Sequence, residues 1–306
     1  MNKNPFSIYD FMGYLFPGVL CYVGLYYCAS LDWNFKAIDF SSLSNVLELE
    51  TADFDLQKSI VMIVLSYILG HMAAYLSSIT IEFMANKIFG YPSEYLLTSD
   101  RLSYRELCRH YFECGADSSN KLLRWVKNVM RFILKVAVLA LLLPISFTTF
   151  TFAYLTDLNG WIVRPLDSFL IKSILSKQYT LANRIGITHP DVNEKCDYHR
   201  IIQHYVFLNM PNSNKKTENY ITLYGFLRSI SFIFCCMFLI LYLKALKTID
   251  FEASIDWHIV IVLCTLYSVA YITFLGFMKF YRRFTLENYM SLLTGLPNDV
   301  NNSNNC

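Results

Sequence analysis

Residues Ile60–Ile81 read IVMIVLSYILGHMAAYLSSITI, which is 22 residues without a charged side chain. The hydrocarbon core of a bilayer is crossed by ~20 apolar residues in a helix. A helix also satisfies its own backbone hydrogen bonds, which lipid cannot do. This stretch therefore predicts a membrane-spanning helix.

Four other runs have the same character. Phe11–Leu31, Val136–Leu155 and His258–Met278 carry no charge, and Ser229–Leu246 carries only Lys244. Of the 306 residues, 55 % are hydrophobic and 16 % charged, against roughly 25 % charged in soluble domains, and the mean hydropathy is +0.34. This composition argues against a soluble globular enzyme, a disordered chain and a secreted disulfide scaffold. The predicted fold class is all-α: a polytopic integral membrane protein with four or five spans, counting one segment that either spans or re-enters, and a helical cytoplasmic portion.

Charge orients these spans, because Lys and Arg stay on the cytoplasmic side. The loop Asp32–Ser59 carries six acids and two bases, whereas Glu82–Leu134 carries eight bases and Thr156–Arg228 carries nine. Five simple spans with a cytoplasmic N-terminus would put those nine bases outside. If Val136–Leu155 instead enters the membrane and returns to the cytoplasmic side, 21 bases lie inside the cell and four lie outside. Both termini are then cytoplasmic.

Pro144 lies in the middle of that third run, where it can break a helix. A re-entrant segment of two half-helices and a true fifth span therefore both remain open. The net charge of +2 decides nothing by itself.

The spans and loops divide the chain into six parts. These are a two-helix membrane hairpin (1–83), basic cytoplasmic and interfacial helices (84–135), a third membrane segment (136–156), a cytoplasmic helical segment (157–226), a last membrane hairpin (227–281) and a cytoplasmic tail (282–306) with a disordered end. Within the fourth part, Leu166–Ile185 and Asp191–Asn209 predict amphipathic helices. Pro211–Lys216 predicts a turn or linker, and a helix is expected to run from Glu218 into the next span.

One helix outside the spans has a distinct charge pattern. At ~100° per residue its bases fall on one arc and apolar side chains fill the rest; the bases are Lys121, Arg124, Lys127, Arg131 and Lys135. This predicts an interfacial helix whose bases contact anionic lipid headgroups on the cytoplasmic side. A helix packed on other parts of the same protein is the alternative.

The second span carries a polar face. His71, Tyr75, Ser78 and Glu82 fall within an arc of ~60°, and an ionisable group inside a membrane is a functional-site candidate. His71 either bonds a neighbouring helix as a neutral side chain or belongs to a proton, ion or ligand path. Glu82 is either solvated or paired with an arginine of the following loop.

The first span has a matching stripe of small and polar residues: Asp10, Gly13, Tyr14, Pro17, Cys21, Gly24 and Cys28. Small residues let helix backbones approach closely. We therefore expect the two stripes to pack together, with His71 directed at the first span beside Gly18, Cys21 or Gly24. Pro17 should kink the span or start its regular part. Asp10 would lie at the depth of Glu82, where the two acids would hold a cation or each take a basic partner.

No other motif predicts a metal, a cofactor or catalysis. Cys196, His199 and His204 suggest zinc ligands, but their spacing matches no known finger, so none is predicted. The phosphate-binding, dinucleotide-binding, serine-hydrolase and HExxH patterns do not occur, and no basic run interleaved with aromatics predicts a nucleic-acid face.

Three segments resemble a group of bacterial multi-pass inner-membrane proteins without an assigned reaction. They are Tyr9–Gly18, Tyr224–Arg228 and Phe280–Glu287, about a tenth of the chain. The resemblance implies a bacterial inner-membrane location and, because some such proteins lie beside defence or signalling genes, a membrane effector role.

The expected function is therefore a non-enzymatic scaffold, sensor or membrane effector that has a protein partner or forms a homo-oligomer. A small transporter or channel using the His71–Glu82 face is the first alternative, and an intramembrane enzyme is the second.

Overall fold

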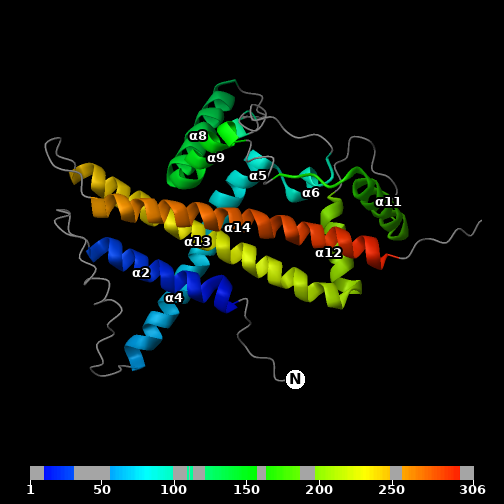
Figure 1. Ribbon diagram of the computed structural model, residues 1–306, viewed down its shortest axis with the longest axis horizontal. Helices are drawn as coiled ribbons and strands as arrows, with labels where there is room; N and C mark the ends of the chain where they lie inside the picture. The colour runs from blue at the N-terminus through cyan, green and yellow to red at the C-terminus, as the bar shows by residue number, and fades with distance from the viewer. Residues whose placement is uncertain are drawn as a thin grey trace, which may run out of the picture.

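The computed structural model describes residues 10–30, 56–98, 109, 111–112, 121–156, 163–186, 197–248 and 257–296, and every regular element among them is a helix (Figure 1). Four helices are long and apolar enough to cross a membrane, or up to five if one bent pair is counted as a single span. The predicted all-α polytopic fold is confirmed. The predicted disordered end of the tail lies outside the described residues.

The longest elements are α13 (Pro211–Thr248) and α14 (Trp257–Gly295), which form the most extensive helix pair of the structure. They run antiparallel along their whole length: only residues 249–256 separate them at one end, and Gly295 adjoins Met210 at the other. At 1.5 Å per residue each is about 57 Å long, well beyond the ~30 Å hydrocarbon core. The apolar halves of both helices therefore continue directly into the part predicted to be cytoplasmic.

This continuity corrects one expectation. Pro211–Lys216 is not a linker but the first turns of α13, because proline fits the first helical position and Asn214 Nδ2 donates to Phe207 O at 2.8 Å. The helix expected to run from Glu218 into the next span is present, and the divisions at 226/227 and 281/282 lie within continuous helices.

Helix α2 (Phe16–Ser30), preceded by the π-helical turn η1 (Phe11–Leu15), crosses α4 (Leu56–Ser77) through two glycines. A Cβ atom on Gly18 would lie 1.6 Å from Ser66 O, and one on Gly70 would lie 1.8 Å from Tyr14 O. The predicted stripe of the first span faces inward: each of its members is buried or half-buried. The regular part of the span starts at Phe16, directly before Pro17, as expected.

The directions of the other helices bear on whether the third apolar run, Val136–Leu155, spans the membrane or re-enters on the same side. α2 lies parallel to α13, since Phe16 contacts Phe226 and Gly24 contacts Met237, and the Lys244 ammonium donates to Cys28 O near the far end. α4 runs antiparallel to α2. The chain therefore leaves α4 and enters α13 at the same end of the bundle, as in the re-entrant arrangement.

The third run itself is broken at Leu142, between α8 (Lys121–Leu141) and α9 (Leu143–Thr156), and the two helices are bent by 97°. The break lies next to Pro144, as predicted. Leu142 and Ile145 are fully buried in the main core with Phe274 and Phe277 of α14, and Thr148 hydrogen-bonds the Tyr267 hydroxyl. A bent pair whose elbow is seated against α14 suits a segment that enters and returns.

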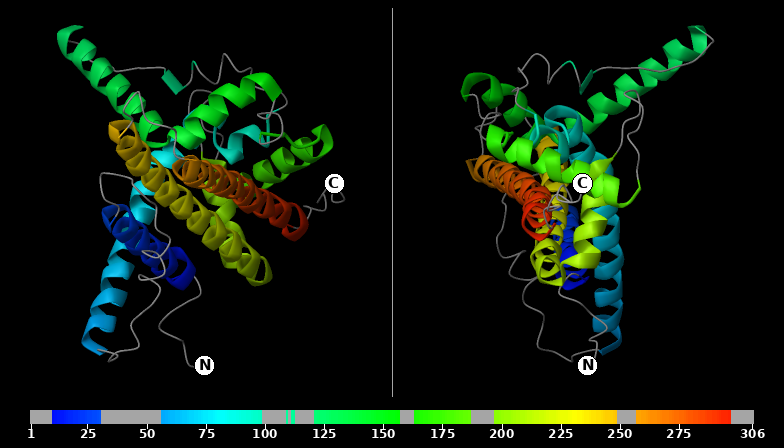
Figure 2. Two further views of the ribbon diagram at one scale, coloured as in Figure 1. Left: turned by 60° about the vertical axis from the view of Figure 1, so that its left-hand side comes forward. Right: turned by 90° about the vertical axis from the view of Figure 1, so that its right-hand side faces the viewer.

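A second core lies beyond the apolar halves of α13 and α14. It joins α6 (Pro92–Tyr95), α11 (Ser168–Arg184) and α12 (Tyr198–Asn209) to the end of α14 (Figure 2). Asp167 and Asp197 cap the N-termini of α11 and α12 by accepting from Leu170 N and Arg200 N. The two predicted amphipathic helices thus exist, and they form a helical unit built around α14.

Candidate functional site

A charged pair lies where the second span leaves the apolar region. Continuing α4, residues Ser78–Glu82 form the π-helical turn η2, which leads into α5 (Phe83–Phe89). The Glu82 carboxylate forms an ion pair with the Arg228 guanidinium of α13, and only 24 % and 12 % of these side chains are exposed. Buried charges in proteins are paired and hydrogen-bonded, and this pair meets that requirement.

The last turn of α4, directly before the π turn, provides additional partners for the arginine. A π turn shifts the backbone hydrogen bonds from i→i+4 to i→i+5, and Arg228 Nη2 donates to Ala74 O at 3.3 Å just before it. Arg228 Nε donates to Ser77 Oγ at 3.2 Å, and Ser78 Oγ donates to Glu82 Oε2 at 3.3 Å. Arg228 therefore fastens α13 to the irregular turn of the second span.

The predicted polar face does not form one cluster. His71 stacks on Tyr14, with ring centroids 3.8 Å apart and an interplanar angle of 18°, while the side chain of Tyr75 is 67 % exposed and points away from the bundle. The prediction used a constant 100° per residue, but a π turn accommodates one extra residue. Glu82 is thereby displaced around the helix relative to His71.

The prediction that His71 is directed at the first span is confirmed, although its ring contact is Tyr14 rather than Gly18, Cys21 or Gly24. Glu82 takes its arginine from α13, not from the loop that follows it. Asp10 is half-buried where η1 begins, and a cation shared by Asp10 and Glu82 stays a prediction.

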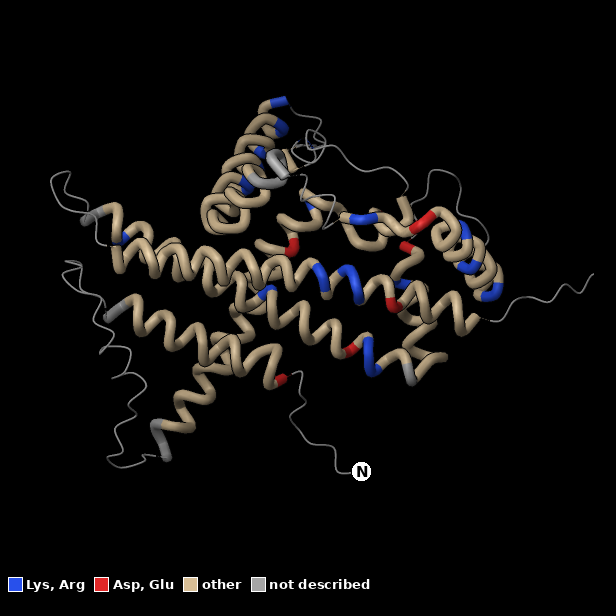
Figure 3. The backbone as a smooth tube through the Cα atoms, viewed as in Figure 1, with Lys and Arg blue, Asp and Glu red and all other residues tan. Residues whose placement is uncertain are grey.

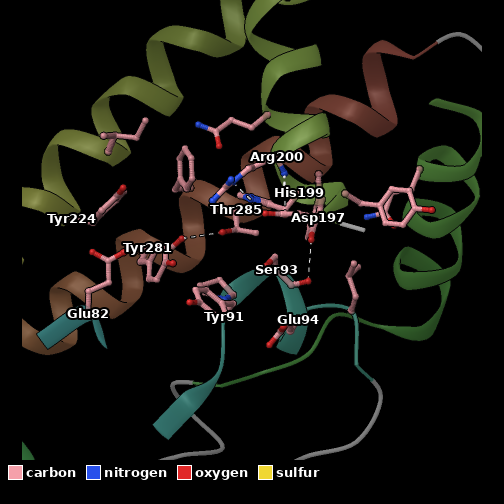
Figure 4. A pocket seen from close by; sticks show the side chains of 18 of the residues that line it. Glu82, Tyr91, Ser93, Glu94, Asp197, His199, Arg200, Tyr224, Tyr281 and Thr285 are labelled. Atoms are coloured by element: carbon pink, nitrogen blue, oxygen red, sulfur yellow. Dashed lines mark hydrogen bonds and ion pairs between the residues drawn. The ribbon is translucent and has the colours of Figure 1, made fainter. Parts of the chain in front are cut away.

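Glu82 also lines a cavity of about 750 Å³ between the second core and the long helices (Figure 4). Its walls come from η2, the segment around α6, α11, α12, α13 and α14. Pockets for small molecules are typically 300–1,000 Å³ and carry a few placed polar groups. The cavity has a size that suits a small molecule.

One wall of the cavity is a row of rings in contact. Tyr281 lies 5.3 Å from Tyr224, Tyr224 lies 5.9 Å from Phe284, Phe284 lies 6.0 Å from His199, and His199 lies 5.9 Å from Tyr289, all between ring centroids. Glu82 lies at the Tyr224 and Tyr281 end of the row, and Asp197, Ser93 and Glu94 lie toward the Tyr289 end (Figure 4).

One polar atom of the cavity wall lacks a hydrogen bond among the described residues. His199 Nε2 is buried without a partner, and burial lowers the pKa of this imidazole, an effect that nearby Asp197 opposes. Gln178, which is only 7 % exposed, also lines the cavity. The cavity wall therefore contains a neutral imidazole and a side-chain amide.

The carboxylates of the cavity differ in whether they form ion pairs. Glu82 is paired with Arg228, and Asp197 with Arg200 at 3.2 Å in an exposed pair. Glu94 forms no ion pair within the described residues. No group of three His, Cys, Asp or Glu side chains that could hold a metal occurs among the described residues; Cys196, one of the weighed zinc ligands, lies outside them.

The basic helix is α8, and it extends away from the other helices (Figures 2 and 3). Its apolar side chains are exposed as well as its bases: Trp125 is 66 % exposed, Met130 67 % and Ile133 60 %. Exposed apolar side chains on this helix favour the interfacial prediction over a helix packed on other parts of the same protein. Lys135 is a correction to the predicted headgroup contacts, since it is 8 % exposed with its ammonium 5.9 Å from the Tyr111 ring centroid.

Sequence reasoning missed most of this site. Arg228, Tyr224, Gln178 and Tyr289 are not among the predicted site residues, although Tyr224–Arg228 and Phe280–Glu287 carry the resemblance and both contribute to the cavity or to the ion pair. No family model, no curated protein and no solved structure matches the chain.

Proposed function

We propose that the protein is a non-enzymatic sensor of a bacterial inner membrane, with both termini in the cytoplasm. In this proposal a small molecule occupies the cavity, and the spans respond through the Glu82–Arg228 pair. The observation that supports it is that one carboxylate, Glu82, both lines the cavity and pairs with Arg228 beside the π turn of the second span.

Transport along the His71–Glu82 face has less support. That hypothesis requires His71 to line a water-filled cavity continuous with Glu82. The cavity that contains Glu82 does not include His71 among its lining residues, and His71 lies against Tyr14 on the other side of the π turn. In the proposed function, a protein partner or a second copy of the chain reads the response of the spans, within a defence or signalling system as the resemblance implies.

The coupling is tested with Glu82→Gln in the full chain reconstituted in nanodiscs. The amide keeps the shape of the side chain but removes the charge that Arg228 neutralises. The resulting loss of local stability should spread from η2 into the cavity wall. We expect faster amide hydrogen exchange in α12 (Tyr198–Asn209) as well as at residues 74–83. Exchange reports local opening of this kind.

Glu218→Gln is the matched control, because Glu218 is an exposed acid of α13 that does not line the cavity. It should leave exchange in α12 unchanged. A change in Glu82→Gln that stays within residues 74–83 and 224–232 would refute the proposed coupling.

We further propose that α8 lies in the cytoplasmic interface and binds anionic lipid through Lys121, Arg124, Lys127 and Arg131. Changing these four bases to Gln should reduce the phosphatidylglycerol that co-purifies with the protein, because each base near an anionic surface contributes on the order of 1 kcal/mol. The control changes four exposed bases elsewhere, Lys172, Arg184, Lys215 and Lys216, to Gln. Equal lipid retention by the two variants would contradict a role specific to α8.

A further inference from the structure

The cavity has a distribution of charge and aromatic rings that restricts what it can bind. Carboxylates lie toward both ends of the row Tyr281, Tyr224, Phe284, His199 and Tyr289, with Glu82 at one end and Glu94 with Asp197 at the other. Asp197 and Glu94 are both close enough to Tyr289 to act electrostatically on its hydroxyl. The walls between the two ends are formed by ring faces and edges.

The cationic groups of the cavity do not reverse this acidic character. Among the described residues of the lining, Arg200 is the one arginine or lysine, and it is already paired with Asp197. The buried His199 imidazole has a lowered pKa, so it adds no positive charge at neutral pH. An anionic ligand such as a phosphate would meet the carboxylate of Glu94, which has no ion pair within the described residues, and would gain no base that is not already paired.

A cation fits the same groups well. Ammonium groups bind over tyrosine rings, and the attraction grows when water is excluded. A carboxylate has about four acceptor positions, so Glu82 can accept from a ligand while it remains paired with Arg228. Glu94 is exposed and forms no ion pair within the described residues, and Gln178 adds a side-chain amide to the lining.

We propose that the cavity binds a linear organic polycation, a diamine or longer polyamine, whose terminal ammonium groups lie at the two acidic ends and whose alkyl chain lies along the rings. The inference rests on the proposed sensor function and names the class of molecule sensed. One ammonium group contacts Glu82, and the other contacts Glu94 and Asp197.

The test is isothermal titration of the purified full chain in neutral detergent with 1,4-diaminobutane and with spermidine. Butylamine carries one charge and should bind at least about tenfold more weakly, since a charge-assisted hydrogen bond contributes roughly 1.5–3 kcal/mol. Glu94→Gln should weaken diamine binding by about tenfold for the same reason. Asp197→Asn should also weaken it, and asparagine preserves the cap of α12.

Glu218→Gln is again the control and should bind the diamine like the unaltered chain. The proposal is overturned if neither amine shows saturable binding, or if the double variant Glu94→Gln/Asp197→Asn binds as tightly as the unaltered chain. Failure here together with normal coupling in the Glu82→Gln exchange experiment would reject the ligand class alone. Diamine binding without that coupling would reject the sensor function alone.

Discussion

Arg228→Met should destabilise the protein by up to about 3–5 kcal/mol, the cost of removing one partner of a fully buried ion pair, since this pair is part-buried. The loss arises because Glu82, which is 24 % exposed, would keep a carboxylate without a countercharge in a poorly solvated place. Ser77 Oγ and Ala74 O would also lose their donors from Arg228. Thermal unfolding in detergent, followed by circular dichroism, measures the effect.

The double variant Glu82→Gln/Arg228→Met separates the contribution of the two charges to stability from the contribution of side-chain packing. It should recover most of the lost stability, because removing both charges is often neutral or favourable and the amide introduced at position 82 can still accept from the Ser78 hydroxyl. Lys216→Met is the control: Lys216 is 68 % exposed and lies 3.5 Å from Glu287, which is 23 % exposed, so this solvated lysine should contribute less than about 1 kcal/mol. A double variant no more stable than Arg228→Met would show that the pair acts through packing.

The spans of this protein could be predicted from sequence because hydropathy alone decides them. Ile60–Ile81 and His258–Met278 contain no Asp, Glu, Lys or Arg, and each lies in a helix long enough to cross a bilayer. The inward stripe of the first span was also predictable, since small residues at helical spacing mark a packing face. Such patterns are local, so one sequence suffices to detect them.

The ion pair was not predictable by the same means. Glu82 and Arg228 are 146 residues apart, and both lie at the ends of apolar runs, where solvated charges are ordinary. The π turn at Ser78–Glu82 also changes the angular position of every residue after it, and no composition rule marks it. The cavity depends on six elements at once, so its residues could be united only in the folded chain.

The position of α8–α9 is an intermediate case. Charge counting favoured a segment that enters and returns, and Pro144 indicated where it would break. The parallel alignment of α2 and α13, which rests on contacts such as Phe16 with Phe226, fits the arrangement that the count of bases favoured. Such contacts between distant helices could not be read from the sequence.

Gly70→Leu should prevent the first two spans from crossing as they do and should cost more than about 3 kcal/mol. Overpacking a core typically costs 1–3 kcal/mol where side chains can adjust. Here the obstacle is backbone: a Cβ on Gly70 would lie 1.8 Å from Tyr14 O, and one on Gly18 would lie 1.6 Å from Ser66 O. The helices would have to separate, which would also remove the stacking of His71 on Tyr14.

Gly225 provides the control for this prediction, because it too lies inside a helix, α13, but a Cβ there would meet nothing within 4 Å. Gly225→Ala should therefore raise stability by roughly 0.5–1 kcal/mol through the higher helix propensity of alanine. The two substitutions should change the free energy of unfolding in opposite directions. This difference distinguishes a steric requirement at the α2–α4 crossing from a general intolerance of glycine replacement. A Gly70→Leu protein that unfolds at the temperature of the unaltered chain would refute close backbone contact between α2 and α4. The close approach would then have to be replaced by a looser pairing, in which the Tyr14–His71 contact no longer depends on the two glycines.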